Sequence, residues 1–156
     1  MKKINMLTRT HLAITVFFIL LLFSSVDYKL EFIIVSVIAT FIPDIDFRFS
    51  KIGNYKTSRI LQLFVKHRGI MHSFTFLFII SLFLILFFPV IAFPFFLGYS
   101  LHLLADSFTI KGIKPFYPSK KNFSGKLKSG SRAEILVFVS FLITDLLLFF
   151  IVIFNM

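Results

Sequence analysis

Hydrophobic residues occur along the chain in five long runs, separated by polar and charged stretches. The runs cover Leu12–Val26, Leu30–Ile42, Ile70–Phe88, Val90–Ala105 and Ile135–Phe154. The third and fifth reach the roughly 20 residues that a helix needs to cross a bilayer, and the others approach that length with flanking residues. Pro89, with Pro94 as a second candidate, marks a turn between the third and fourth runs because proline disfavours helix continuation. The pattern predicts an all-α, polytopic membrane bundle of about five transmembrane helices.

The composition agrees with a membrane protein. Of the 156 residues, 58% are hydrophobic, with 25 phenylalanines and no tryptophan, whereas soluble domains are roughly 45–50% apolar. The length corresponds to one domain, so we expect residues 1–156 to form a single membrane-embedded unit. The chain has no cysteine, which excludes disulfides and thiolate metal ligands.

Lysine and arginine residues fall almost entirely on one side of the predicted bundle. Three precede the first run, six lie between the second and third, and seven lie between the fourth and fifth. This accounts for 16 of the 17, and only Lys29 falls on the other side. The positive-inside rule makes the basic side cytoplasmic. We therefore expect the N-terminus inside the cell, the C-terminus outside, and residues 111–132 to form a basic cytoplasmic loop.

The net charge of +10 is explained by this topology and by attraction to anionic lipid headgroups. Membrane lipids are the expected partners, and nucleic acid is not, since no nucleic-acid-binding motif accompanies the charge. An alternative for the first run is a signal peptide, because Lys2 and Lys3 precede it and Ser24 and Ser25 follow it. Cleavage would discard His11, which the next observation makes an important residue.

Histidine and acidic residues collect at the cytoplasmic ends of the predicted helices. All four histidines and four of the seven acids lie there, on five separate segments: His11, Asp44, Asp46, His67, His72, His102, Asp106 and Glu134. Ionisable groups at a membrane are costly and persist when they are paired, bind a metal or line a wet cavity. Eight such side chains at one depth predict a site for two or three divalent ions. Zinc suits these ligands, and manganese or iron are alternatives.

Two local spacings bear on this site. His102 and Asp106 lie four residues apart and would share a helix face one turn apart. In "HRGIMHS", Gly69 would let the backbone turn, so that His67 precedes a helix and His72 lies in its first turn. Taken alone, the His-x-x-x-Asp spacing is also typical of a histidine that is simply hydrogen-bonded to an aspartate.

The remaining candidates also have structural alternatives when each is taken alone. In "IPDID", Pro43 is expected to end the second helix, which would place Asp44 and Asp46 on an extended segment with their side chains on one side. The alternative is a solvated helix terminus. His11 alone would suit a helix interface, and Glu134 alone is an acid favoured in the first turn by the helix dipole. Their coincidence at one end of the bundle favours the metal site.

The motifs "PDID", "HRGIMHS" and "GYSLHLLADSFTIKGIKPFYP", with an early His and a later Glu, resemble the YdjM-like family of membrane-bound metal-dependent hydrolases over about residues 10–135. These are also described as LexA-binding, inner-membrane-associated proteins, and they distantly resemble zinc-dependent phospholipase C. The resemblance implies that the eight residues above form the metal centre or its surroundings, in an inner membrane protein. Phe47 stands where some members carry a further His, and LexA binding is not carried over by these residues.

Together these features predict a metal-dependent hydrolase at the cytoplasmic face, with a phosphoester as its phosphate-bearing substrate. Divalent ions acidify a water molecule and stabilise phosphate oxygens. Asp44 or Asp46 is the expected general base, and the guanidinium of Arg68 is expected to hold the phosphate. Three further residues are expected beside the ligands or the substrate: Ser73, Thr109 and Lys111.

A metal-binding membrane protein without catalysis, either a carrier or a structural partner, is the main alternative, and a lipid-anchored docking module is another. A carrier needs polar residues continuing to the far side, where the sequence offers little beyond Asp145. Asp145 follows Glu134 by 11 residues, about 16 Å along a helix, so we expect a polar contact between helices there. The stretch 119–131, "SKKNFSGKLKSGS", is predicted to be mobile.

Overall fold

The described part of the chain is built from helices. The computed structural model describes residues 8–52 and 68–154, without the side chains of residues 45–52, 68 and 69. Its elements are α1 (Thr8–Leu22), the 3-10 turn η1 (Phe23–Ser25), α2 (Lys29–Ile52), α4 (Arg68–Met71), α5 (Phe74–Phe87), α6 (Pro89–Ser107) and α7 (Arg132–Phe154). No strand occurs among the described residues, so the all-α prediction is confirmed.

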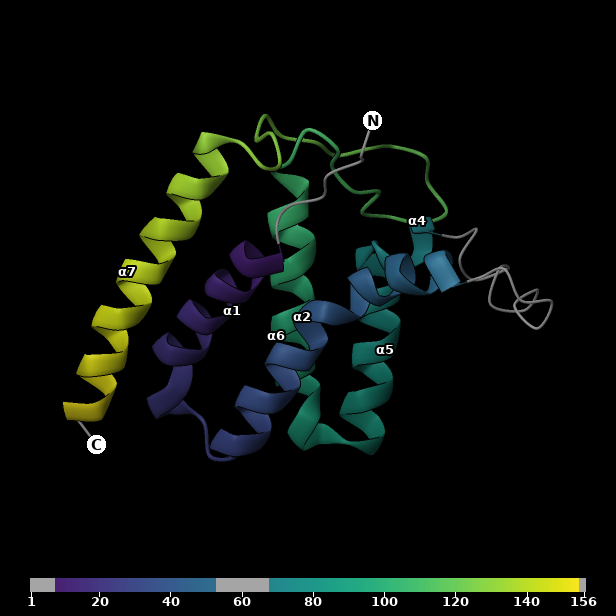
Figure 1. Ribbon diagram of the computed structural model, residues 1–156. Helices are drawn as coiled ribbons and strands as arrows, with labels where there is room; N and C mark the ends of the chain where they lie inside the picture. The colour runs from purple at the N-terminus through teal and green to yellow at the C-terminus, as the bar shows by residue number, and fades with distance from the viewer. Residues whose placement is uncertain (1–7, 53–67, 155–156) are drawn as a thin grey trace.

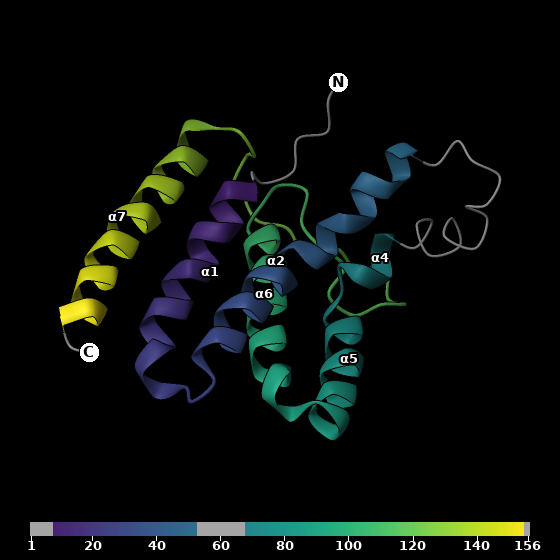
Figure 2. The ribbon, with the colours of Figure 1, turned by 60° about the horizontal axis from the view of Figure 1, so that its bottom comes forward.

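The five longer helices correspond to the five predicted hydrophobic runs and alternate in direction. Figures 1 and 2 show the N-terminal ends of α1, α5 and α7 and the C-terminal ends of α2 and α6 toward the same end of the bundle. Within the described residues, three segments are long and apolar enough to cross a membrane, namely Thr8–Ser25, Pro89–Ser107 and Arg132–Phe154. With 14 residues, α5 is about 21 Å long. The structure therefore supports a membrane bundle, and the count of five spans stays a prediction.

The prediction that the second helix ends at Pro43 is wrong. Pro43 lies inside α2 and is buried, and the helix continues to Ile52. On a helix, positions two apart are separated by about 200°. The reason for expecting Asp44 and Asp46 on one side therefore no longer holds.

The start of the third helix also differs from the prediction. Arg68–Met71 forms the single turn α4, so Gly69 lies in a helical turn rather than at a bend. The backbone breaks at His72 and Ser73, and α5 begins at Phe74. Ser73 has extended backbone angles and its hydroxyl accepts a hydrogen bond from Phe76 N–H (3.3 Å), as an N-cap residue does. His72 thus precedes the long helix instead of lying in its first turn.

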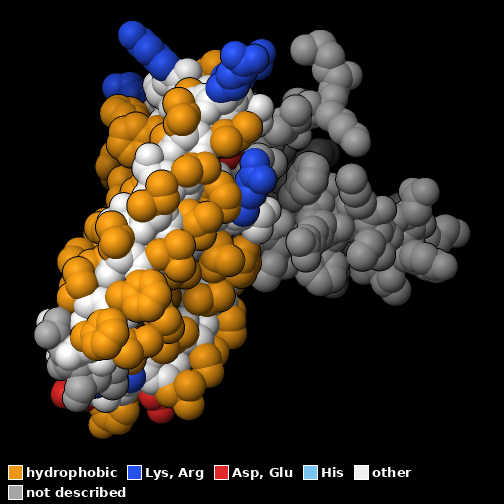
Figure 3. Space-filling model, turned by 60° about the vertical axis from the view of Figure 1, so that its left-hand side comes forward, with side chains coloured by type: hydrophobic (Ala, Val, Ile, Leu, Met, Phe, Trp, Pro, Cys, Tyr) orange, Lys and Arg blue, Asp and Glu red, His pale blue; other side chains and the backbone are white. Residues whose placement is uncertain are grey.

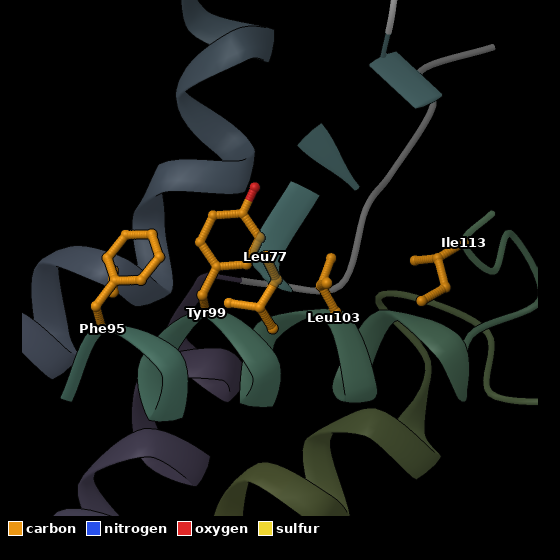
Figure 4. Close-up of a cluster of buried hydrophobic side chains, with 6 residues drawn as sticks. Leu77, Phe95, Tyr99, Leu103 and Ile113 are labelled. Atoms are coloured by element: carbon orange, nitrogen blue, oxygen red, sulfur yellow. The ribbon is translucent and has the colours of Figure 1, made fainter. Parts of the chain in front are cut away.

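The apolar core lies between α2, α5 and α6. Its buried members are Ala39, Leu77, Phe95, Tyr99, Leu103 and Ile113. Figure 4 shows the α6 side chains in a row, with Leu77 of α5 beside Tyr99 and with Ile113 of the following loop at the end of the row. The loop is therefore anchored to the bundle through Ile113, directly beside the end of α6 that carries His102 and Asp106.

Small and hydroxyl-bearing residues let α1, α2 and α6 approach closely in the interior. A Cβ on Gly98 would lie 2.0 Å from the Ser36 carbonyl oxygen, so only glycine fits this crossing. The Thr15 and Thr40 hydroxyls are 2.8 Å apart, and Thr40 Oγ1 donates to the carbonyls of Ser36 (2.8 Å) and Gly98 (3.3 Å). Such contacts are typical of helix association in membranes, where apolar burial alone gives little driving force.

The loop between α6 and α7 is paired through its backbone, and the mobility predicted for residues 119–131 stays a prediction. Isolated bridges join Thr109 to Leu127 and Ile113 to Phe123. The backbone N–H of Gly125 also donates to the Thr109 carbonyl (2.9 Å). These pairings fold the loop back over the end of the bundle, as Figure 1 shows.

The surface separates apolar sides from a basic end. Figure 3 shows hydrophobic side chains over the face carried by α7, with Lys and Arg side chains gathered at the end where the long loop lies. Exposed large residues on α7 include Leu136, Leu147 and Phe150. A long helix with such a surface is stabilised in lipid rather than in water.

Asp145 gives a prediction about packing. It is buried in α7, which packs against α1, and its Oδ1 has no hydrogen-bond partner among the described residues. We expect Asp145→Asn to keep bound metal and to change the free energy of unfolding by about 1 kcal/mol or less, as for other polar contacts between membrane helices. Thermal unfolding and metal analysis in detergent would measure both, with Thr144→Val as a neighbouring control. Loss of metal from a stably folded Asp145→Asn protein would show that our placement of α7 is wrong.

Candidate metal centre

Five of the eight predicted ligands meet at the end of the bundle. Two groups have one ligand atom per residue, with all atoms of a group within 4.8 Å of one another. One group is His11, His102 and Asp106, and the other is Asp44, His72 and His102. The residues come from α1, α2, α6 and the break before α5. His102 belongs to both groups and therefore lies where they join.

The distances between these side chains suit metal coordination. Asp106 Oδ1 lies 3.4 Å from His11 Nε2, and Asp106 Oδ2 lies 3.7 Å from His102 Nε2 and 4.0 Å from His72 Nε2. Asp44 Oδ1 lies 3.9 Å from Nε2 of both His72 and His102. Ligand atoms about 2.0–2.2 Å from one tetrahedral ion lie roughly 3.3–3.6 Å apart. The observed separations match or exceed this by a few tenths of an ångström.

Asp106 occupies the middle of the site. One carboxylate oxygen faces His11, and the other faces His72 and His102. The His11 and His102 rings stack with their centroids 4.1 Å apart, and the His72 ring meets His102 edge-on at 5.9 Å. A carboxylate with an oxygen toward each side can serve two neighbouring ions.

Unpaired nitrogens provide the test of whether a metal fits. Among the described residues, five buried imidazole nitrogens have no hydrogen-bond partner: both of His11, both of His102 and Nδ1 of His72. A buried polar group without a partner is costly, and native proteins keep few of them. A divalent cation would satisfy Nε2 of His11 and of His102, which face the carboxylates, and would offset the charge of the two carboxylates. The donor set of imidazole and carboxylate suits zinc, manganese or iron.

Contacts around the ligands hold them in place. His102 and Asp106 are one turn apart on α6, as predicted from their spacing. Tyr99, one turn before His102 on the same helix, donates its hydroxyl to the Met71 carbonyl (2.5 Å), directly before His72. This hydrogen bond ties the break before α5 to α6, so the two histidines are positioned together.

Glu134 is not brought into either group. It is fully buried at the start of α7, where its Oε1 accepts a hydrogen bond from Thr10 Oγ1 (3.2 Å) and its Oε2 accepts one from Gly130 N–H. Oε1 therefore joins α7 to α1 beside His11, and Oε2 joins α7 to the loop before it. These contacts suit the alternative of a first-turn acid, and the role of Glu134 as a ligand stays a prediction.

Three other predicted site residues are not placed at the level of their side chains. His67 lies outside the described residues, and the side chains of Asp46 and Arg68 are not described. Three roles therefore stay predictions: His67 as a ligand, Asp46 as a ligand or general base, and Arg68 as the residue that holds the phosphate.

The three predicted neighbours of the site have different surroundings. Ser73 is buried and caps α5, and its hydroxyl donates to the Ile70 carbonyl (2.5 Å), so its contacts are structural. The Thr109 hydroxyl donates to the carbonyl of Asp106 (2.7 Å), which fixes the end of α6 next to a ligand. Lys111 lines a cavity with Asp106. Of the three, only Lys111 lines this cavity.

A cavity of about 200 Å³ adjoins the ligands. It is lined by His72, Asp106, Lys111, Gly112, Ile113, Lys114 and Asn122. Lys114 and Asn122 were not predicted as site residues, because their place depends on pairing between the two arms of the loop. The available signal was the short spacing between Lys111 and Lys114 after α6, and Lys114 was counted only as positive charge.

Comparison with known proteins gives a family and no closer relative. A family model described as YdjM inner membrane protein matches residues 6–155. No curated protein and no solved structure matches the chain. Because the match covers nearly the whole sequence, the chain belongs to the YdjM inner membrane protein family.

Proposed function

We propose that this member of the YdjM inner membrane protein family is a metal-dependent hydrolase of phosphoesters, acting at the cytoplasmic face of the membrane. The observation that carries the proposal is the cavity lined both by two candidate metal ligands, His72 and Asp106, and by two lysines, Lys111 and Lys114. Ligands for a divalent ion and cationic groups in one cavity suit a substrate with a phosphate group.

The residues of the chain have separate tasks in the proposed reaction. His11, Asp44, His72, His102 and Asp106 would hold the divalent ions. Such ions, when bound, supply Lewis-acid stabilisation of phosphate oxygens and lower the pKa of a water molecule. A metal site closed by protein on all sides would be structural, whereas an adjoining cavity leaves room for a substrate.

The proposed step is hydrolysis of a phosphorus–oxygen ester bond. The water oxygen forms a bond to phosphorus while the bond to the leaving alkoxide oxygen breaks. One proton of the water passes to a carboxylate oxygen that does not hold an ion, for which the second oxygen of Asp44 is the described candidate, and a proton ends on the alcohol product. Lys111 and Lys114 neutralise the phosphate oxygens, and the Arg68 guanidinium is proposed to join them.

The cytoplasmic placement follows from the charge distribution and is testable by itself. We expect reporter fusions after Lys56 and after Gly125 to report a cytoplasmic position, and a fusion at the C-terminus to report the opposite side, because basic loops stay inside. Paired reporters that are active on one side only would measure each position. An external position for the fusion after Gly125 would overturn the topology and the cytoplasmic site with it.

A panel of phosphoesters tests the activity. Protein purified in detergent, freed of metal and reloaded with zinc, manganese or iron, should release alcohol and phosphate products from at least one monoester or diester, and a chelator should abolish the release. Metal-free protein is the control for each substrate. Bound metal without turnover of any phosphoester would refute the hydrolase and favour a non-catalytic metal-binding protein.

A further inference from the structure

The cavity next to the metal centre is lined by groups of different chemistry. His72 and Asp106 are candidate metal ligands, and the loop after α6 contributes Lys111, Lys114 and Asn122. The loop thus brings two ammonium groups and an amide to the lining. Ammonium and amide N–H groups are donors that bind the anionic oxygens of phosphate.

Backbone contacts fix the part of the loop that carries these donors. Ile113 and Phe123 exchange backbone hydrogen bonds of 2.9 and 2.8 Å, and Ile113 is buried in the core. Gly112 has a φ of +62°, and a Cβ there would lie 2.1 Å from the Phe123 carbonyl oxygen. Asn122 Nδ2 donates to the Lys111 carbonyl (3.2 Å), which joins the two arms of the loop beside the cavity.

The same loop exposes large apolar side chains outside the helices. Four of them are 59–67% exposed: Phe108, Ile110, Phe116 and Phe123. Ile110 directly precedes Lys111, and Phe123 directly follows Asn122, so apolar groups border the polar cavity. Large exposed apolar groups beside a polar cavity favour an interaction site.

The charges of the loop identify the partner of this apolar surface. Between Asp106 and Glu134 the chain has six lysines and one arginine and no acidic residue. Apolar side chains with lysines between them, at the end of a membrane bundle, suit the boundary between headgroups and acyl chains of anionic lipids. A protein partner would require acidic groups of its own, whereas the bilayer is already present at this end of the bundle.

We propose that the cavity is a binding site for the phosphate headgroup of a membrane lipid, which enters along the apolar surface of the loop. Its volume of about 200 Å³ is below the roughly 300–1,000 Å³ of sites for drug-sized ligands. A headgroup fits this space, and the acyl chains stay outside against Phe116 and Phe123. The claim that a phosphate-bearing lipid is the substrate rests on the proposed hydrolase function. The claim that such a lipid binds in the cavity is testable without that function.

Binding of a lipid that cannot be hydrolysed tests the proposal directly. The probe is a phosphonate analogue of phosphatidic acid, added to the metal-loaded full-length protein in detergent, with inorganic phosphate as the soluble probe. The double variant Lys111→Gln/Lys114→Gln should weaken binding of the lipid probe by tenfold or more, since each lost charge-assisted hydrogen bond costs about that factor. The matched control Lys120→Gln/Lys121→Gln removes the same charge from exposed positions outside the cavity and should change affinity by less than about twofold.

A second pair of variants distinguishes a lipid from free phosphate. Phe116→Ser/Phe123→Ser should weaken the lipid probe by about tenfold and leave inorganic phosphate unchanged, because only the lipid has chains to lose contact with. Phe87→Ser, at the other end of α5 and similarly exposed, should leave both unchanged. Equal affinity for the lipid probe and inorganic phosphate would overturn the proposal. An equal loss of lipid affinity in the Lys111/Lys114 and Lys120/Lys121 variants would also overturn it.

The outcomes separate this inference from the proposed function. Tight binding of the lipid probe through Lys111 and Lys114, without hydrolysis of any phosphoester, keeps the binding site and refutes the hydrolase. Hydrolysis of soluble phosphoesters, with no preference for the lipid probe, keeps the hydrolase and refutes the lipid site.

Discussion

His102→Ala is expected to remove bound metal and hydrolysis together. His102 belongs to both ligand groups and is almost fully buried, with neither ring nitrogen hydrogen-bonded within the described residues. Loss of a residue that only supports a ligand costs roughly 10–100-fold in metal affinity or activity, so loss of a shared ligand should exceed about 100-fold in both. Metal analysis by plasma emission and phosphoester turnover would measure the two effects on the same preparation.

His11→Ala provides the comparison within the same site. His11 belongs to one group only, so its removal should lower metal content partly, while His102→Ala lowers it for both groups. Circular dichroism should show retained helix in each variant. A folded His102→Ala protein with the metal content of wild type would refute the two-group arrangement.

Gly98→Ala is expected to be strongly destabilising despite adding only one methyl group. The new Cβ would lie 2.0 Å from the Ser36 carbonyl oxygen, and this neighbour is backbone of α2 and cannot move alone. Overpacking of an interior costs about 1–3 kcal/mol and occasionally more, and a clash with backbone belongs at the upper end. Because α2 carries Asp44 and α6 carries His102 and Asp106, separating the helices should also lower metal binding. Thermal unfolding in detergent and metal analysis would measure both.

Leu104→Ala is the matched control for this prediction. Leu104 is exposed on the same helix, so its truncation should change stability by less than about 0.5 kcal/mol and leave metal bound. If Gly98→Ala melts at the wild-type temperature and keeps its metal, α2 and α6 do not cross as closely as described.

The fold could be predicted where the sequence carries long apolar runs. Run length and the position of Pro89 placed the ends of the long helices to within a few residues, except for the C-terminal end of α2, because these properties act locally. Pro43 shows the limit of such reasoning. A proline is expected to end a helix, but Pro43 is buried inside α2 and the helix continues to Ile52. The close crossing at Gly98 could not be predicted either, since it depends on which helix lies opposite.

The sequence predicted that His, Asp and Glu side chains lie at one end of the bundle, but not which of them contact one another. The placement of His102 and Asp106 followed from their spacing on one helix. Glu134 has the right chemistry at the right depth, yet its oxygens are engaged by Thr10 and Gly130, and the sequence does not show that competition. Lys114 and Asn122 became site residues only through the pairing of the loop.

Metal analysis of the wild-type protein, combined with X-ray absorption at the edge of the metal found, tests the central claim most directly. The account predicts about two divalent ions per chain, held by imidazole nitrogens and carboxylate oxygens at about 2.0–2.2 Å with no sulfur. The measurement should be made on monodisperse, helical protein purified without chelator and again after addition of each metal. Failure of this folded protein to bind any divalent ion tightly would contradict the account.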